Sequence, residues 1–174
     1  MEEGTEGTVA KFADDTKICR GTGSIEEAGG LQKDLDRLGE WAKKWQMEYN
    51  VEKCEVMHFG RRNGGIDYFL NGKMLRESET QRDLGVIVQD SLKFNVQVQS
   101  AARNANAMLA FMSRGLEYKS RDVLLWLYKA LVRPHLEYCE QFWAPYLRKD
   151  VLALERVQRR CTRMIPGMKS LYEE

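Results

Sequence analysis

The chain has 174 residues, of which 43% are hydrophobic and 30% charged, and its formal net charge is +1. With only 3 proline and 14 glycine residues, this composition excludes a fibrous repeat and argues against intrinsic disorder. A globular chain of this length can bury roughly 70% of the surface that its unfolded form exposes, which is enough for one fair-sized core.

The first predicted element, residues 8–20, is a β-hairpin that carries two adjacent carboxylates. The run Phe12-Ala13-Asp14-Asp15 lies between two short β-prone segments. Aspartates are poor in strand interiors but favoured in tight turns, so we place Asp14 and Asp15 at the tip of the hairpin. Neighbouring side chains point to opposite faces of a straight strand, and a turn would let both approach one cation. The pair is therefore either a Mg²⁺ site or an exposed turn.

Residues 24–45 are predicted to form an amphipathic helix. Ser24 and Glu27 have the spacing of a capping box, and apolar residues follow at helical period. We expect this stripe to face the core and Asp34 to lie off it. The stripe consists of Leu31, Leu35, Leu38, Trp41 and Trp45.

Strand signals follow the helix. Residues 54–59 and residues 84–88 are each predicted to form a strand, because β-branched and aromatic residues are concentrated there. Residues 68–75 are predicted to form a hairpin that turns at Asn71-Gly72, since this dipeptide supplies the positive φ angles of a type I′ turn.

The chain is predicted to be helical from Asn95 onward. One helix carries an apolar stripe and is closed by Gly115, and Ser120 can cap the next helix. A last amphipathic helix follows Pro145 and ends near Pro166-Gly167. The residues expected to face inward are Val98, Ala101, Ala102, Ala105, Leu109, Met112, Val123, Leu124, Leu127, Tyr128, Leu131, Val151, Leu154, Val157, Cys161 and Met164 or Ile165.

Charge is distributed unevenly along the chain. Residues 1–30 hold seven acidic and three basic residues, or −4, whereas residues 148–169 hold seven basic and two acidic residues, or +5. In the last helix Arg156, Arg160 and Arg163 share one face and Arg159 adjoins them. This cluster is either the solvated face of an amphipathic helix or a surface that follows nucleic-acid phosphates.

The four cysteines stand alone, so neither a disulfide framework nor a zinc ribbon is predicted. No apolar run approaches the ~18 residues that a membrane span needs, and the acidic N-terminal segment lacks the apolar core of a signal peptide. We expect an intracellular protein, in the cytoplasm or nucleus, that is neither secreted nor embedded in a membrane.

Several runs together carry a family resemblance. In chain order they are residues 12–17 (Phe-Ala-Asp-Asp-Thr-Lys), the Trp41-x-x-x-Trp45 helix, residues 50–60, 83–86, 131–139, 141–145 and 154–160. They resemble LINE-type (non-LTR) retrotransposon reverse transcriptases, closest to the chicken-repeat clade of vertebrates. The resemblance implies an α+β fold, in which a truncated antiparallel palm sheet with a flanking helix occupies residues 1–90 and an all-α thumb-like bundle occupies residues 91–174.

The resemblance also implies a function, RNA-directed DNA polymerase activity, with an RNA template, a DNA primer and two Mg²⁺ ions. Asp14 and Asp15 match the pair that holds the ions. Lys53 falls where related polymerases place a lysine that assists pyrophosphate departure, although a solvated surface lysine is an equal alternative. Leu84 and Gly85 match a turn that helps hold the primer end, or else form a core strand with a glycine bulge.

Only eleven residues precede Phe12, so a further catalytic aspartate and the fingers expected for this family would be absent. We therefore expect weak Mg²⁺ binding and no polymerase activity from this chain alone. Exposed strand edges would favour self-association, and the helical half should be the better-folded part. The alternatives are a non-catalytic nucleic-acid-binding or interaction module, or a retroelement relic without function.

Overall fold

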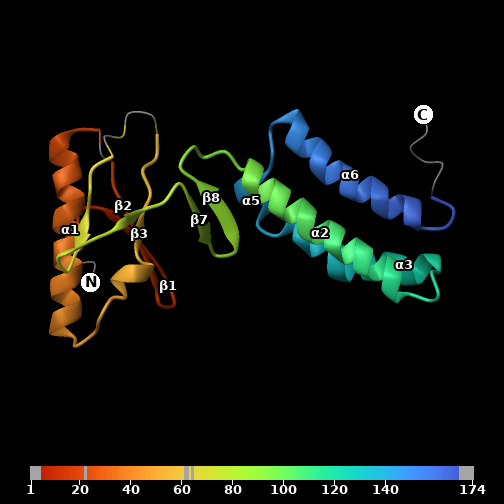
Figure 1. The fold of residues 1–174 in the computed structure, drawn as a ribbon, viewed down its shortest axis with the longest axis horizontal. Helices are drawn as coiled ribbons and strands as arrows, with labels where there is room; N and C mark the ends of the chain where they lie inside the picture. The colour runs from red at the N-terminus through yellow and green to blue at the C-terminus, as the bar shows by residue number, and fades with distance from the viewer. Residues whose placement is uncertain (1–4, 22, 61–62, 64, 169–174) are drawn as a thin grey trace. The chain divides into compact units, whose positions relative to one another are not determined.

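The computed structural model describes residues 5–21, 23–60, 63 and 65–168. The chain forms two compact units, Met1–Thr80 and Gln81–Glu174, and each unit has its own buried clusters. Helices and small sheets both contribute, so the predicted α+β class is confirmed (Figure 1). The division falls after residue 80, before the boundary predicted at residue 90. The correspondence of the two units to a palm and a thumb stays a prediction.

The first unit combines one long helix with short strands. Its elements are β1 (Thr8–Phe12), β2 (Asp15–Cys19), α1 (Ile25–Lys44), the 3₁₀ turn η1 (Val51–Lys53), β3 (Glu55–Val56), β4 (Phe69–Leu70), β5 (Lys73–Met74) and β6 (Arg76–Glu77). Leu35 from α1 packs with Tyr68, Leu70 and Leu75 in the core of this unit.

The predicted single antiparallel sheet is wrong. The described strands pair in four separate two-stranded sheets: β1 with β2, β3 with β6, β4 with β5, and β7 with β8. The β3–β6 pair is parallel, and Glu55 forms an ion pair with Arg76 across it. Strand β3 covers two residues of the predicted 54–59 segment.

Helix α1 starts as its sequence predicts. The Ser24 Oγ accepts a hydrogen bond from the Glu27 N–H at 3.2 Å, and the Glu27 carboxylate accepts one from the Gly23 N–H at 2.8 Å. These two bonds form a capping box that reaches back one residue further than the usual pattern. The inward placement of Trp45 is wrong, because this residue caps the C-terminus of α1 and is 61% exposed.

The hairpin predicted at Asn71-Gly72 is confirmed. Both residues have positive φ, 52° and 77°, as a type I′ turn requires, and β4 pairs antiparallel with β5. The Gln32 side chain of α1 then acts as a third partner of this hairpin. Its amide donates to the Phe69 carbonyl oxygen at 2.8 Å and accepts from the Phe69 N–H at 2.9 Å. The Gln32 side chain thus forms the hydrogen bonds that a further strand would otherwise form with the β4 backbone.

Asp34 is fully buried, although we predicted it to lie off the apolar stripe. Its carboxylate accepts hydrogen bonds from the N–H groups of Glu6 (3.1 Å) and Gly7 (2.9 Å), and from the guanidinium groups of Arg20 (3.2 Å) and Arg37 (3.4 Å). Glu6 and Gly7 precede β1 and Arg20 follows β2, so one carboxylate ties both ends of the β1–β2 hairpin to α1.

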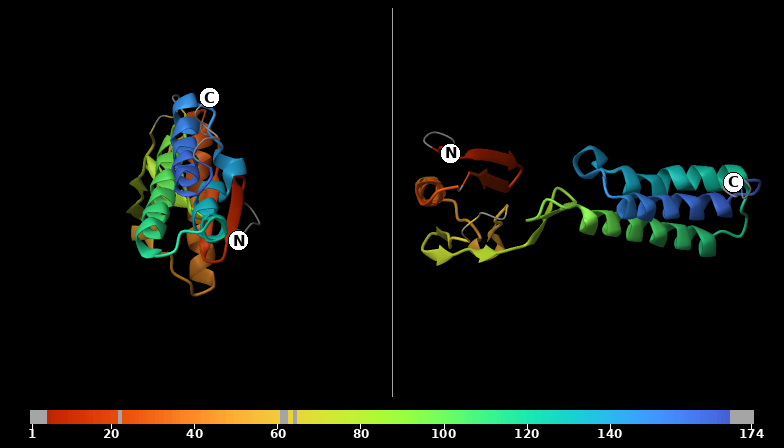
Figure 2. Two further views of the ribbon diagram at one scale, coloured as in Figure 1. Left: turned by 90° about the vertical axis from the view of Figure 1, so that its right-hand side faces the viewer. Right: turned by 90° about the horizontal axis from the view of Figure 1, so that it is seen from above.

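The second unit is helical after one hairpin. Its elements are β7 (Thr80–Asp83), β8 (Val86–Gln89), α2 (Asn95–Gly115), α3 (Arg121–Leu127), the π-helical turn η2 (Tyr128–Val132), α4 (Arg133–Glu137), α5 (Glu140–Trp143) and α6 (Arg148–Met164). Helices α2 and α6 run alongside each other (Figures 1 and 2). In the described part of the chain, no helix combines the length and apolar character that crossing a bilayer requires.

The predicted stripes of α2 and α6 face the helical core. Leu109 and Met112 of α2 pack with Val157 and Cys161 of α6, and the Ser120 side chain caps α3 by accepting from the Val123 N–H. The inward placement of Val123 itself is wrong, because its side chain is 40% exposed. The core of this unit is therefore formed mainly by long helices that the helical spacing of apolar residues predicted from the sequence.

The chain from α3 to α4 continues without a break through a widened turn. The Arg133 N–H donates to the Tyr128 carbonyl, five residues earlier. Pro134 has no N–H, and its ring would crowd the carbonyl of the residue four positions before it in a regular helix. A π-helical turn at this place relieves that clash.

Two glycines of α1 form a matched pair for testing the Asp34 network. A Cβ at Gly30 would lie 2.3 Å from the Arg20 Cζ, whereas a Cβ at Gly29 would meet no atom within 4 Å. We expect Gly29→Ala to raise the free energy of unfolding of the first unit by about 0.5–1 kcal/mol. Gly30→Ala should lower it by about 1–2 kcal/mol, because the guanidinium must leave Asp34. Urea titration with hydrogen exchange of α1 amides measures both, and equal gains would contradict this role for Gly30.

The network also predicts loss of stability in acid. Burial raises the pKa of Asp34, but the hydrogen bonds from Glu6, Gly7 and Arg20 outweigh it and hold the pKa below its usual value. The stabilisation is therefore complete above the unfolded-state pKa, about 3.9, and is lost as the pH falls through the lower folded-state pKa. We expect Asp34→Asn to flatten the fall in the stability of the first unit below about pH 4. The exposed Glu40→Gln variant should keep the wild-type profile.

Candidate metal and nucleic-acid sites

The turn between β1 and β2 carries the two aspartates. Asp14 follows Ala13 in the turn, and Asp15 is the first residue of β2, where it pairs with Phe12. The predicted hairpin is thus confirmed, but Asp15 lies beside the tip and not within it. Both aspartates are exposed. Ala13 has φ +52°, a left-handed conformation that costs on the order of 1 kcal/mol for a residue other than glycine.

The base of this hairpin is more firmly held than its tip. The Asp34 carboxylate binds the chain on both sides of the hairpin, and Arg20 also pairs with Glu6 at 2.6 Å. Side-chain hydrogen bonding to Arg20 lowers the pKa of Glu6, and the same contact raises the pKa of Arg20. A network at the base thus presents the Asp14–Asp15 turn to solvent.

The two aspartates offer the kind of ligand atoms that Mg²⁺ prefers, but they are too few to complete its coordination shell. Carboxylate oxygens are the hard ligands that this ion prefers, and both side chains are accessible. Within the described residues, however, no three histidine, cysteine, aspartate or glutamate side chains gather in a way that could hold a metal ion. Asp14 and Asp15 therefore supply part of a coordination shell, and two ions need more ligands.

Lys53 ends the 3₁₀ turn η1 and its side chain is exposed. It belongs to the same unit as Asp14 and Asp15. In the part of the chain that the structure describes, no hydrogen bond or ion pair joins Lys53 to either aspartate. The role of Lys53 beside a departing pyrophosphate stays a prediction.

Leu84 and Gly85 form the turn of the β7–β8 hairpin, in the second unit. Both have positive φ, 45° and 87°, and the strand that follows is Val86–Gln89. The alternative of a core strand with a glycine bulge is therefore wrong. The Leu84 carbonyl accepts a hydrogen bond from the Tyr138 hydroxyl at 2.9 Å, while the Leu84 side chain is 45% exposed. Tyr138 thus fixes the turn backbone and leaves an apolar side chain in solvent.

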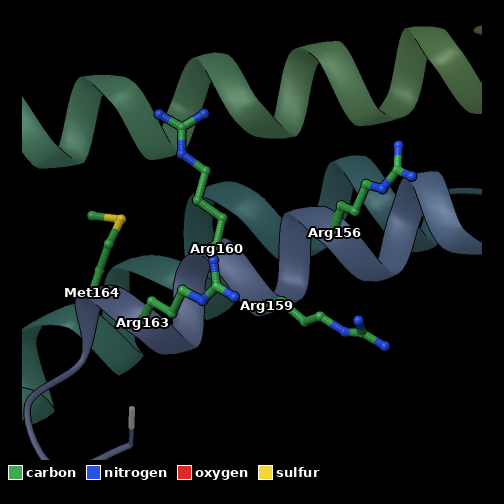
Figure 3. A pocket seen from close by; sticks show the side chains of 5 residues that line it. All are labelled: Arg156, Arg159, Arg160, Arg163 and Met164. Carbon is green, nitrogen blue, oxygen red and sulfur yellow. The ribbon is translucent and has the colours of Figure 1, made fainter. Parts of the chain in front are cut away.

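The four arginines of α6 line one open hollow of about 500 Å³ together with Met164 (Figure 3). All four are exposed. Arg159 forms an ion pair with Glu155 at 3.1 Å, and Arg160 donates to the Asn106 Oδ1 of α2 at 3.2 Å. Figure 3 shows Arg160 extended toward the neighbouring helix and Arg159 directed away from it. The four predicted arginines thus line one hollow, and the charge of Arg159 is partly neutralised by Glu155.

Sequence reasoning missed the residues that position these features. Asp34 stands three residues after Leu31 and four before Leu38, which is the spacing of the buried stripe itself. That spacing indicates burial of Asp34, but the charge of its side chain favoured an exposed position in the prediction. Tyr138 and Gln97 offered no comparable signal, because each acts on a residue distant in sequence or in another element.

Curated relatives match nearly the whole chain. It is 28% identical over 164 residues to the RNA-directed DNA polymerase from mobile element jockey of Drosophila melanogaster. This match covers 91% of the chain and 18% of the relative. The corresponding protein of Drosophila funebris is 28% identical over 169 residues, or 93% of the chain and 18% of the relative. The probable RNA-directed DNA polymerase from transposon X-element of Drosophila melanogaster is 24% identical over 164 residues, with 91% and 18% coverage.

No protein-family model and no solved structure matches the chain. The chain spans about 18% of the length of the curated relatives it matches. The relatives named here are Drosophila elements, so membership of the chicken-repeat clade stays a prediction. Along nearly its whole length the chain is thus similar to RNA-directed DNA polymerases of LINE-type (non-LTR) mobile elements.

Proposed function

We propose that the chain is a segment of an RNA-directed DNA polymerase in which the β1–β2 turn contributes carboxylates to the metal site. Support comes from one combined observation: the similarity to such polymerases runs along 91–93% of the chain, and Asp14 and Asp15 lie exposed at a supported hairpin. Mg²⁺ bound there would activate the primer hydroxyl and neutralise the triphosphate. The ligands by this proposal are an RNA template and a DNA primer.

Other residues take supporting roles in this proposal. Lys53 would approach the departing pyrophosphate, and the Leu84-Gly85 turn would contact the primer end. The polymerase would act inside the cell, in the cytoplasm or nucleus. Short two-stranded pairs such as β1–β2 would offer a route to self-association through their edges.

The same two aspartates are too few for this chain alone to catalyse DNA synthesis. Two-metal nucleotidyl transfer needs at least one more carboxylate to bridge the ions. The described residues bring no third acidic side chain to Asp14 and Asp15. We infer weak ion binding here and catalysis only where further polymerase sequence completes the shell.

A second function, nucleic-acid binding without catalysis, is supported by the arginine hollow of α6. Its lining of four exposed arginines and one methionine contains no carboxylate. Such a surface attracts backbone phosphates without regard to sequence. Metal binding at the β1–β2 turn and phosphate binding at α6 are compatible with each other in one segment of a polymerase.

We expect Mn²⁺, used as a paramagnetic substitute for Mg²⁺, to broaden the amide signals of residues 13–16 in the full chain. The Asp14→Asn, Asp15→Asn double variant should abolish this broadening, because it removes both anionic ligands while keeping side-chain size. The exposed Glu40→Gln variant serves as the control and should leave it unchanged. Equal broadening in the double variant would show that the two aspartates do not bind the ion.

Primer extension on an RNA template separates ion binding from catalysis. We expect the unmutated chain to incorporate no nucleotide. Incorporation that disappears in Asp14→Ala would instead show that the chain catalyses on its own and that our inference of inactivity is wrong.

Salt dependence tests the arginine hollow. We expect Arg156→Gln and Arg163→Gln each to flatten the slope of log K against log salt for single-stranded DNA by about 0.7. Arg159→Gln should have a smaller effect, because Glu155 already neutralises this side chain in part. Arg121→Gln, an exposed arginine of α3 outside the hollow, is the control. Slopes unchanged in all three cluster variants would exclude the hollow from the interface.

A further inference from the structure

The turn of the β4–β5 hairpin places an asparagine directly before a glycine, at Asn71 and Gly72. Both residues are exposed. The side chain of an asparagine ends in an amide, and its carbon atom Cγ can be attacked by the backbone nitrogen of the next residue. Because Gly72 has no side chain, the approach of its nitrogen to Cγ meets little steric hindrance. The two residues thus have the composition for a reaction between a side chain and the backbone.

The hydrogen-bond ladder of this hairpin does not use the Gly72 nitrogen. Phe69 pairs with Met74 and Leu70 with Lys73, so both turn residues lie beyond the last pair. In a two-residue turn the closing hydrogen bond joins the flanking residues and leaves out the two central ones. The ladder therefore does not restrain the nitrogen that would react.

The Asn71 side chain lies against helix α1 at Gly39. Gly39 is buried, and a Cβ added to it would lie 2.6 Å from the Asn71 Oδ1 and 3.6 Å from the Asn71 Cγ. Only a residue without a side chain leaves room for this contact. Attack on Cγ needs the Gly72 nitrogen eclipsed with the Asn71 Cβ, an arrangement that the ψ angle of a type I′ turn does not provide. The turn must therefore open locally, and Asn71 must leave Gly39, before the reaction occurs.

We propose that Asn71 is a site of spontaneous deamidation, and that its contact with Gly39 sets the rate. The Gly72 nitrogen forms a bond to Cγ, and the bond from Cγ to the side-chain nitrogen breaks. That nitrogen leaves as ammonia and takes the proton of the Gly72 N–H. Water then opens the five-membered imide ring and returns a proton to the Gly72 nitrogen. Attack of water at Cγ gives aspartate, and attack at the backbone carbonyl carbon gives isoaspartate.

The two products differ in their effect on the first unit. Aspartate tolerates the positive φ of 52° at this position, so it keeps the turn and adds one negative charge. Isoaspartate carries the backbone through the side chain, which adds a carbon atom to a two-residue turn and disturbs the pairing of β4 with β5. Leu70 and Leu75, which pack with Leu35 and Tyr68, would then lose their place in the core.

The test follows the full chain at neutral pH by peptide mapping with mass spectrometry, which detects the loss of the amide nitrogen at residue 71. We expect conversion in the unmutated chain and at least threefold faster conversion in Gly39→Ala, whose methyl group displaces the Asn71 side chain. Gly29→Ala is the matched control, because a Cβ there meets no atom within 4 Å. It should react no faster than the unmutated chain.

Two further measurements separate the side-chain contact from general unfolding. The Leu75 N–H, which donates to the Tyr68 carbonyl at 2.8 Å, should stay protected from hydrogen exchange in Gly39→Ala. Its protection should be lost in the isoaspartate fraction, separated by ion exchange, and kept in Asn71→Asp. In concentrated urea Asn71 should convert as fast as Asn63, which also precedes a glycine, because the contact with Gly39 is then absent.

Each contrary result overturns a stated part of the proposal. Absence of conversion at Asn71 in both the unmutated chain and Gly39→Ala overturns the site. Equal rates in Gly39→Ala and Gly29→Ala, or a rate that unfolding in urea leaves unchanged, overturn the role of Gly39. Faster conversion with loss of Leu75 protection in Gly39→Ala overturns the side-chain contact as the cause, because the hairpin itself would have opened. The metal and nucleic-acid functions proposed above involve other residues and stand or fall separately.

Discussion

The buried carboxylate of Asp34 is the interaction on which the first unit depends. An isolated charge in a protein interior is costly, and it persists only where hydrogen bonds replace the lost water. Asp34 receives two backbone and two guanidinium donors, from both ends of the β1–β2 hairpin and from its own helix. The hairpin thus keeps its place by polar contacts at its base, while its turn contributes no buried residue to the core.

The second unit secures its own hairpin in a comparable way. Val86 of β8 packs with Val98, Ala101 and the buried Trp143, and the Gln97 and Tyr138 side chains bond the backbone of the hairpin. In both units a short two-stranded pair, marginal by itself, is held by side chains from helices. Asp14 and Asp15, to which we assign chemistry, are exposed, whereas Asp34, which ties their hairpin to α1, is buried.

This separation bears on how the segment could serve a polymerase. Asp14, Asp15 and the α6 arginines are all accessible, so they can meet an ion or a strand without a change in their own unit. Asp34, which supports the turn of the two aspartates, is buried, so a substitution there acts through position and stability. Under the proposed function, substitutions of the exposed residues would act without unfolding their unit, whereas substitutions of Asp34 would also destabilise it.

The sequence by itself determined what is local. The Ser24 cap, the Asn71-Gly72 turn and the stripes of α2 and α6 depend on residues close together in the chain, and its ordered motifs pointed to the polymerase family. Tertiary structure alone decided the burial of Asp34, the parallel pairing of β3 with β6 and the hydrogen bond from the Ile87 N–H of β8 to Gln97 of α2. The physical reason is that a polar group is buried only when donors from distant segments converge on it, and a local pattern does not encode that convergence.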